Sequence, residues 1–116
     1  MLSMNNEEII QSFLKSSREL LEGNRNDRLR SVLLDEFGPL EYAFIADWIP
    51  EQGEDIYTVI VPPDSVVIVE LSRIDPDEEP LVKRLPYREW KRGKRLGRKT
   101  DVLDKWIHKT TKANEF

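Results

Sequence analysis

The sequence predicts an α+β fold: an antiparallel three- to four-stranded β meander with N-terminal and C-terminal helices packed on one face. Three observations predict it. Apolar residues recur at helical spacing before residue 22, alternate along the chain between residues 40 and 74, and return to helical spacing after residue 86. The 116 residues suffice for one domain with its own core, so a single domain over 1–116 is expected.

The first predicted element is a helix that ends near Gly23. Asn5 or Asn6 is a suitable N-cap, and Glu7 and Glu8 follow at the positive end of the helix dipole. One face of this helix is formed by Ile9, Ile10, Phe13, Leu14, Ser17, Leu20 and Leu21.

Residues 27–37 fit either a short helix or a strand. Leu29, Val32 and Leu33 have helical spacing behind Asp27, which suits a cap, whereas a strand would lead directly into the turn at 38–39. We favour the helix.

Short turns separate three predicted strands, so strands adjacent in sequence should pair antiparallel. The strands are 40–48, 56–61 and 66–74, with turns at 50–54 and 62–65, an acidic loop at 75–80 and, as the fourth strand, an edge segment at 81–85. If alternation continues through 40–48, one face of the sheet packs against both terminal helices. The expected core is Tyr42, Phe44 and Trp48 against Phe13, Leu20 and Trp106.

The chain after residue 85 is basic and is predicted to be helical. Pro86 suits a first helical position, and Tyr87 and Trp90 share one face. A last helix is expected after Thr100, with the apolar stripe Val102, Leu103, Trp106 and Ile107.

Charge is divided between two parts of the chain. Residues 83–116 hold twelve Lys and Arg against four Asp and Glu, a net of +8, whereas residues 1–82 hold six against eighteen, a net of −12. The overall −4 conceals both halves. Such asymmetry concerns partners and solubility rather than the fold.

The composition excludes several chemistries. Without cysteine there are no disulfides, no cysteine-ligated zinc and no thiol catalysis. His108 is the single histidine, and no serine lies in a nucleophile-elbow pattern, so we expect no enzyme activity, no metal site and no cofactor. Residues 93–100 miss the phosphate-loop pattern because Arg98 separates Gly97 from Lys99.

Pro63-Asp64 followed by Glu70 resembles the metal-binding carboxylates of the restriction-endonuclease-like nucleases. The resemblance implies a magnesium-dependent nuclease. That family places a lysine two residues after the second acid, where this chain has Ser72. Pro-Asp is also an ordinary turn dipeptide, so we favour a turn.

Two surfaces are candidates for binding. The first is acidic and would attract a basic protein: Asp47, Glu51, Glu54, Asp55, Asp75, Asp77, Glu78 and Glu79. In an up-down-up meander the turn at 50–54 and the loop at 75–80 fall at the same end. The second surface interleaves basic and aromatic residues, as single-stranded nucleic acid requires: Arg88, Trp90, Lys91, Arg92, Lys94, Arg95 and Arg98.

We favour the acidic surface because nonspecific nucleic-acid binders usually carry a net basic domain. In size, acidity and lack of catalytic residues, the chain resembles the small bacterial immunity proteins that block cognate toxins, many of them basic nucleases. This resemblance implies a cytoplasmic, non-enzymatic inhibitor of a basic toxin. Nucleic-acid binding through residues 83–99 is the alternative, and no membrane segment is expected.

Overall fold

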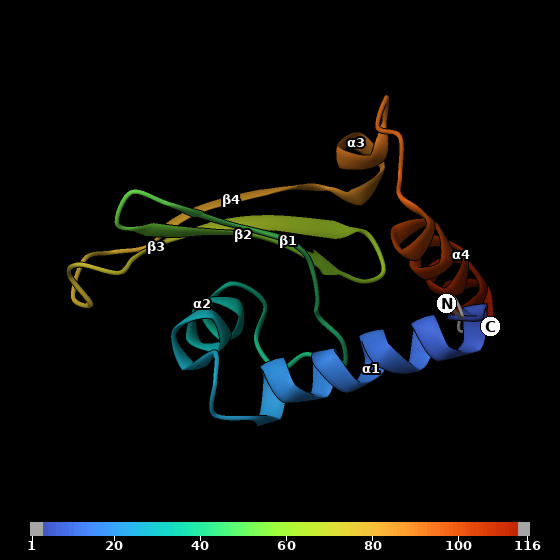
Figure 1. The fold of residues 1–116 in the computed structure, drawn as a ribbon, viewed down its shortest axis with the longest axis horizontal. Helices are drawn as coiled ribbons and strands as arrows, with labels where there is room; N and C mark the ends of the chain where they lie inside the picture. Colours follow the sequence, from blue (N-terminus) through green and yellow to red (C-terminus); the bar gives the residue numbers. More distant parts are fainter. Residues whose placement is uncertain (1–3, 114–116) are drawn as a thin grey trace.

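The computed structural model describes residues 4–113 and confirms the α+β class (Figure 1). Four antiparallel strands form one sheet in the order β1-β2-β3-β4: β1 (Phe44–Glu51), β2 (Glu54–Val61), β3 (Ser65–Ser72) and β4 (Leu81–Pro86). Two helices precede the sheet, α1 (Asn6–Glu22) and α2 (Asp27–Phe37), and two follow it, α3 (Tyr87–Lys91) and α4 (Arg98–Ala113).

Helix α1 begins and ends at the residues that the sequence indicates. The Asn5 side chain accepts a hydrogen bond from the Glu8 N–H at 2.8 Å, and the Gly23 N–H donates to the Glu19 carbonyl. The buried Ser17 hydroxyl accepts the Ala43 N–H at 3.0 Å, which ties α1 to the segment entering β1. Residues 27–37 form helix α2, as the favoured alternative predicts.

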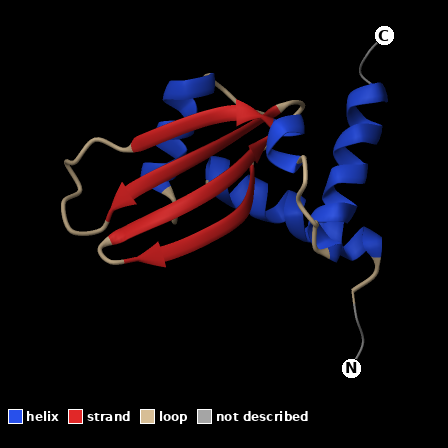
Figure 2. Cartoon of the chain, turned by 90° about the horizontal axis from the view of Figure 1, so that it is seen from above, coloured by secondary structure: helices blue, strands red, loops and turns tan. Residues whose placement is uncertain are grey.

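The two faces of the sheet differ in their cover. Helices α1 and α2 lie on one side of the sheet, while the other side is uncovered except where α3 lies at one end (Figures 1 and 2). We call the uncovered side the open face. It contains Asp47, Ile49, Glu51, Glu54, Ile56, Thr58, Ile68, Glu70, Leu81 and Lys83, since cross-strand partners share a face and neighbours along a strand do not.

The interior consists of two clusters rather than the single core predicted above. The helix-face core packs α1 and α2 against the covered side of the sheet: Leu20, Leu29, Val32, Leu33, Ala43, Val59, Val61, Val67, Val69 and Leu71. The C-terminal core packs α3 and α4 at the other end: Phe44, Ile60, Val66, Tyr87, Leu103 and Ile107, with Phe13, Tyr42 and Trp106 against them. Leu20 therefore lies apart from the aromatic residues with which it was grouped.

The prediction that Trp48 is buried beside Phe44 is wrong. Strand β1 begins at Phe44 rather than at residue 40, and its register shifts between Ile45 and Asp47. The extra residue is a β-bulge, which reverses the alternation beyond it. Trp48 consequently pairs with Tyr57, on the opposite face from Phe44, and 54% of its surface is exposed.

None of the helices within residues 4–113 is both long enough and apolar enough to cross a membrane.

Candidate functional site

The charge division along the chain becomes a division in space. The β1–β2 turn and the loop before β4 lie at one end of the sheet, and helix α3 with the connector to α4 lies at the other (Figure 1). The Arg73 N–H donates to the Gly53 carbonyl at 2.7 Å, which joins the loop to the turn. We call this region, with the carboxylates of 51–55 and 75–79, the acidic end.

Local hydrogen bonds hold the loop of the acidic end in one conformation. The Ser72 hydroxyl accepts the backbone N–H groups of Ile74 (3.2 Å) and Asp75 (3.0 Å), and the Asp75 carboxylate accepts the Asp77 N–H at 3.0 Å. A loop ordered in this way loses less conformational entropy when it binds a partner.

Asp55 differs from the other acidic candidates because its carboxylate pairs with a cation within the protein. Its carboxylate accepts the Trp48 indole N–H at 3.0 Å and lies 3.5 Å from the Arg73 guanidinium. The Asp55 side chain lies with Tyr57 on the face of the sheet that α1 and α2 cover, whereas Glu54 lies on the open face. Burial and the Asp55 charge raise the pKa of the Tyr57 hydroxyl, while Arg28 and Arg73 act in the opposite direction.

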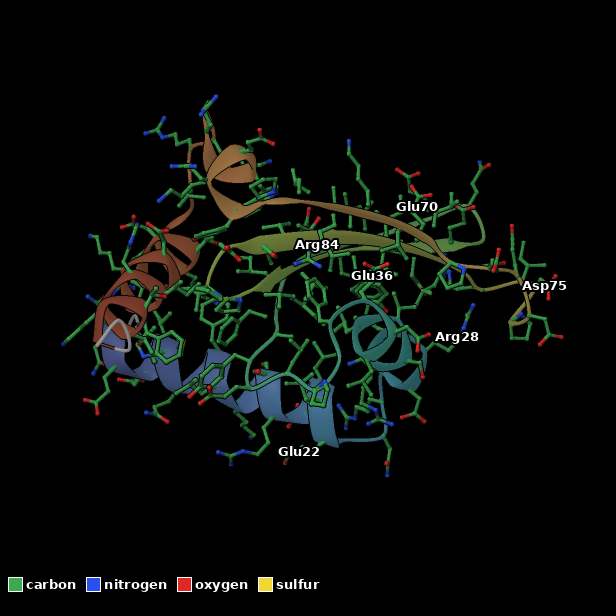
Figure 3. The ribbon with its side chains drawn as sticks, turned by 180° about the vertical axis from the view of Figure 1, so that it is seen from behind. Glu22, Arg28, Glu36, Glu70, Asp75 and Arg84 are labelled. Atoms are coloured by element: carbon green, nitrogen blue, oxygen red, sulfur yellow. The ribbon has the colours of Figure 1, made fainter. Side chains whose placement is uncertain are left out.

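The carboxylates of the remaining acidic candidates have no cationic partner, although those of Asp47 and Asp75 accept backbone N–H groups. Among the described residues, no ion pair involves Asp47, Glu51, Glu54, Asp75, Asp77, Glu78 or Glu79. Asp47, Glu51 and Glu54 are on the open face, where Glu70 joins them as a cross-strand partner of Ile56 and Leu81. Figure 3 shows Glu70 on the side of the sheet away from Arg28 and Glu36 of α2, with Asp75 at the far end.

Exposed apolar side chains gather in the same part of the molecule. Of the six large hydrophobic residues exposed in the described chain, five lie at or near the acidic end: Trp48, Ile49, Ile74 (82% exposed), Leu81 (64% exposed) and Val82. Ile49, Ile56, Glu70 and Leu81 form one row across all four strands of the open face. On the open face, Ile49, Ile56 and Leu81 are bordered by carboxylates, which is the usual anatomy of a protein–protein interface, whereas Trp48 and Val82 lie on the other face.

The basic candidates are partly engaged inside the molecule. Lys91 lies 3.0 Å from the buried Asp104 carboxylate, which also accepts the Tyr87 hydroxyl at 2.7 Å. Burial acts to raise the pKa of Asp104, but these hydrogen bonds and the charges of Lys91 and His108 outweigh it and hold the pKa below its ordinary value. Lys91 is therefore a structural cation joining α3 to α4.

Trp90 is also only partly available for stacking on a nucleic-acid base. Its ring is stacked on Tyr87 at 5.9 Å between centroids, and the Lys94 ammonium lies 5.1 Å from its centre. Arg98 donates to the Asn6 side chain at 3.4 Å. Arg88, Arg92 and Arg95 are exposed.

The nuclease-like carboxylates do not come together. Asp64 precedes β3 and Glu70 lies near its far end, six residues along an extended strand or ~20 Å away. Within the described residues, no group of three or more His, Asp or Glu side chains is arranged to hold a metal ion. His108 is exposed on α4.

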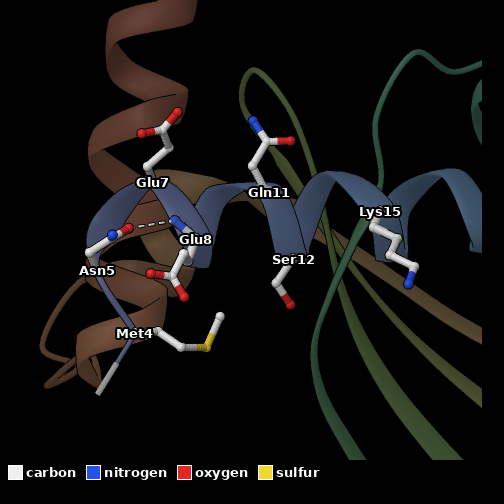
Figure 4. A pocket seen from close by; sticks show the side chains of 7 residues that line it. All are labelled: Met4, Asn5, Glu7, Glu8, Gln11, Ser12 and Lys15. Atoms are coloured by element: carbon white, nitrogen blue, oxygen red, sulfur yellow. Dashed lines mark hydrogen bonds between the residues drawn. The ribbon is translucent and has the colours of Figure 1, made fainter. Parts of the chain in front are cut away.

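Surface hollows supply no alternative site. One hollow follows the first turns of α1, and its lining side chains come from that helix, its N-cap Asn5 and the preceding Met4 (Figure 4). Another lies between α4 and the β2–β3 turn, and Glu41 is its single titratable carboxylate. Among the described residues that line these two hollows, no hydrogen bond joins a hydroxyl to a carboxylate, as it would between a nucleophile and its base.

Sequence reasoning missed Trp48, Ile49, Glu70 and Leu81 as members of the surface. Glu70 had a signal: it alternates with Val69 and Leu71, so it belongs to the face opposite those buried residues. The bulge that exposes Trp48 left no such signal. Comparisons with protein-family models, with curated proteins and with solved structures give no significant match, so function has to be inferred from these residues.

Proposed function

We propose that this protein is a non-enzymatic binding module that recognises a basic protein through the acidic end of its sheet. The supporting observation is that carboxylates without a cationic partner and exposed hydrophobic side chains occur in one region. Either feature alone is ordinary on a protein surface. Together they give an apolar centre for affinity and a charged rim for orientation.

The partner class follows from charge. The carboxylates of Glu51, Glu54, Asp77 and Glu78 carry no cation in the described chain and lie on a hydrogen-bonded turn and loop. A cationic partner would be steered to them, and the encounter would accelerate ten-fold or more at low salt. An acidic inhibitor of a basic toxin, such as a secreted nuclease, is the specific form that we propose.

The experiment is affinity capture from the native lysate with three baits, each tested with and without nuclease treatment. The first is the wild-type chain. The second reverses Glu51, Glu54, Asp77 and Glu78 to lysine. The control reverses Glu19, Glu22, Asp35 and Glu36, exposed residues of α1 and α2 that give the same change in net charge.

A basic protein should be recovered by the wild-type and control baits after nuclease treatment and lost with the second bait. Equal recovery by all three baits would refute the acidic end as the binding surface. If nuclease treatment removes all captured material, nucleic-acid binding by the exposed arginines of 88–95 replaces this proposal.

A further inference from the structure

The open face, rather than an edge of the sheet, is suited to receive the partner, and this inference rests on the function proposed above. We propose that the partner contributes a basic amphipathic α-helix, which lies along β1 and β2 over Ile49 and Ile56, with Leu81 at its margin on the same face. The two edges of the sheet, the charge of the open face and the spacing of its residues all favour such a helix.

The β1 edge is blocked against an added strand. Pro50 has no backbone N–H to donate, and the bulge between Ile45 and Asp47 interrupts the regular ladder. Both features are common protections of exposed sheet edges. Strand addition at β1 is therefore unfavourable.

The β4 edge offers very little free backbone. The Tyr87 N–H donates to the Asp64 carbonyl, so by antiparallel alternation Val82 and Arg84 direct their backbone groups away from β3. Pro80 and Pro86 lie on either side and lack an N–H. Two residues are too few for a stable added strand, and Arg84 adds a positive charge that a basic partner would avoid.

The negative charge of the open face favours a basic partner segment. Asp47, Glu51, Glu54 and Glu70 face the same side, against the single cation Lys83. A second copy of this chain would bring two such sets of carboxylates together, which is repulsive. A basic segment pairs with them instead, while Ile49 (43% exposed) and Leu81 (64% exposed) supply the apolar contact.

The spacing of residues along β1 favours a helical partner segment. Asp47, Ile49 and Glu51 follow one another on one face of β1, ~6.8 Å apart. Residues four apart on an α-helix are separated by ~6 Å along its axis. A helix lying along β1 and β2 can thus place an apolar residue over Ile49 and basic residues one turn before and after it over Asp47 and Glu51.

The test uses the full chain, isotope-labelled for NMR, and a synthetic helical peptide of about 15 residues. The peptide has leucine at the centre of one face and arginine four residues before and after it; the control peptide has glutamate in place of arginine. Amide shifts should concentrate at Asp47–Glu51, Ile56, Ile68 and Glu70, and the control peptide should cause none. Shifts confined to β4 or to α3 and α4, or absence of binding at millimolar peptide, would overturn the proposal.

Substitutions can distinguish binding through the open face from binding through the rest of the acidic end. Ile49→Lys with Leu81→Lys should weaken peptide binding at least ten-fold, and Ile49→Thr with Leu81→Thr at least three-fold if the lysine pair does not fold. The matched control, Leu34→Lys with Gln11→Lys, adds the same charge at exposed residues of α2 and α1, outside the sheet, and should alter binding less than two-fold. Equal effects of the two lysine pairs would overturn the inference. If the reversals at Glu51, Glu54, Asp77 and Glu78 abolish capture of the natural partner while the open-face pair has no effect on it, the proposed function stands and the helix inference falls.

Discussion

Trp48 and Trp106 lie in different environments, although the sequence pattern assigns both to the core. Trp106 packs edge-on against Tyr42 and Phe44, with ring centroids 5.3 and 5.9 Å apart. Trp48 makes one stacked contact with Tyr57 at 6.4 Å and remains half exposed. Trp106 therefore contributes to the stability of the fold, whereas Trp48 is accessible to a partner.

Replacing each tryptophan with alanine should therefore have different effects on stability. Trp106→Ala should lower the free energy of unfolding by about 3 kcal/mol, because it empties a site between aromatic rings. Trp48→Ala should lower it by less than ~1 kcal/mol, since the residue is half exposed and loses one exposed hydrogen bond. Chemical denaturation measures both values, and similar losses would contradict the two placements.

Asp104 is the one buried carboxylate among the described residues, and it joins α3 to α4 through Tyr87 and Lys91. Its lowered folded-state pKa means that its ionised form is stabilised by folding. That contribution is complete above the unfolded pKa, ~4, and is lost as the pH falls through the lower folded value. The pKa of the Tyr87 hydroxyl is raised by burial and by Asp104, so Tyr87 stays neutral throughout this range.

Asp104→Asn should lower the free energy of unfolding at pH 7 by about 2 kcal/mol, because a charge-assisted buried pair is lost. The difference from wild type should shrink as the pH falls below ~4. Asp101→Asn is the control: Asp101 pairs with Lys105 on the surface at 3.2 Å, and its loss should cost at most ~0.5 kcal/mol. Urea unfolding at pH 7, 5 and 3 tests this, and a difference that grows toward low pH would contradict it.

At the scale of the elements, the positions of the strands and helices can be predicted from the residue pattern. The face of the sheet on which each strand residue lies cannot always be predicted. Helix α2 is predictable because Leu29, Val32 and Leu33 can all contact the sheet in a helix, whereas in a strand Val32 and Leu33 would face opposite sides. The bulge in β1 is not predictable from alternation, because Ala46 fits either face. One inserted residue then places Trp48 on the face opposite Phe44. The same residue brings Ile49 and Glu51 of the binding surface onto the open face.

The turn of the acidic end depends on Gly53. Its φ of +75° lies in the left-handed region, and a Cβ atom there would lie 2.5 Å from the Ile74 side chain. Gly53→Ala should lower the free energy of unfolding by about 1–2 kcal/mol, most of it from backbone strain, because the exposed Ile74 side chain has room to move aside. In an Ile74→Ala background at least ~1 kcal/mol should remain.

Gly97→Ala is the matched control for this turn, because Gly97 has no atom within 4 Å of a built Cβ and no positive φ. Its effect should be near zero or slightly stabilising. Thermal or urea unfolding compares the two substitutions. Equal stability of the two variants would show that the turn does not require glycine.

For the whole molecule, the charge division could be read from the sequence, but its consequences could not. An up-down-up meander is sufficient to bring the turn at 51–54 and the loop at 75–79 to one end. The engagement of Asp55 by Trp48 and Arg73, and of Lys91 by Asp104, depends on side chains distant in sequence. One end is left with carboxylates that have no cationic partner and with exposed hydrophobic side chains, and the other end with partly neutralised cations.

The most direct measurement of the central claim is the association rate with the captured partner as ionic strength rises. For the wild-type chain the rate should fall at least ten-fold between low and physiological salt, because screening shortens the reach of the acidic end to ~8 Å. Reversal of Glu51, Glu54, Asp77 and Glu78 to lysine should slow association at low salt and remove most of that dependence, whereas the control reversals on α1 and α2 should retain it. A wild-type rate that is independent of salt, or a reversed variant that associates as fast as wild type, would contradict the claim that the acidic end recognises the partner.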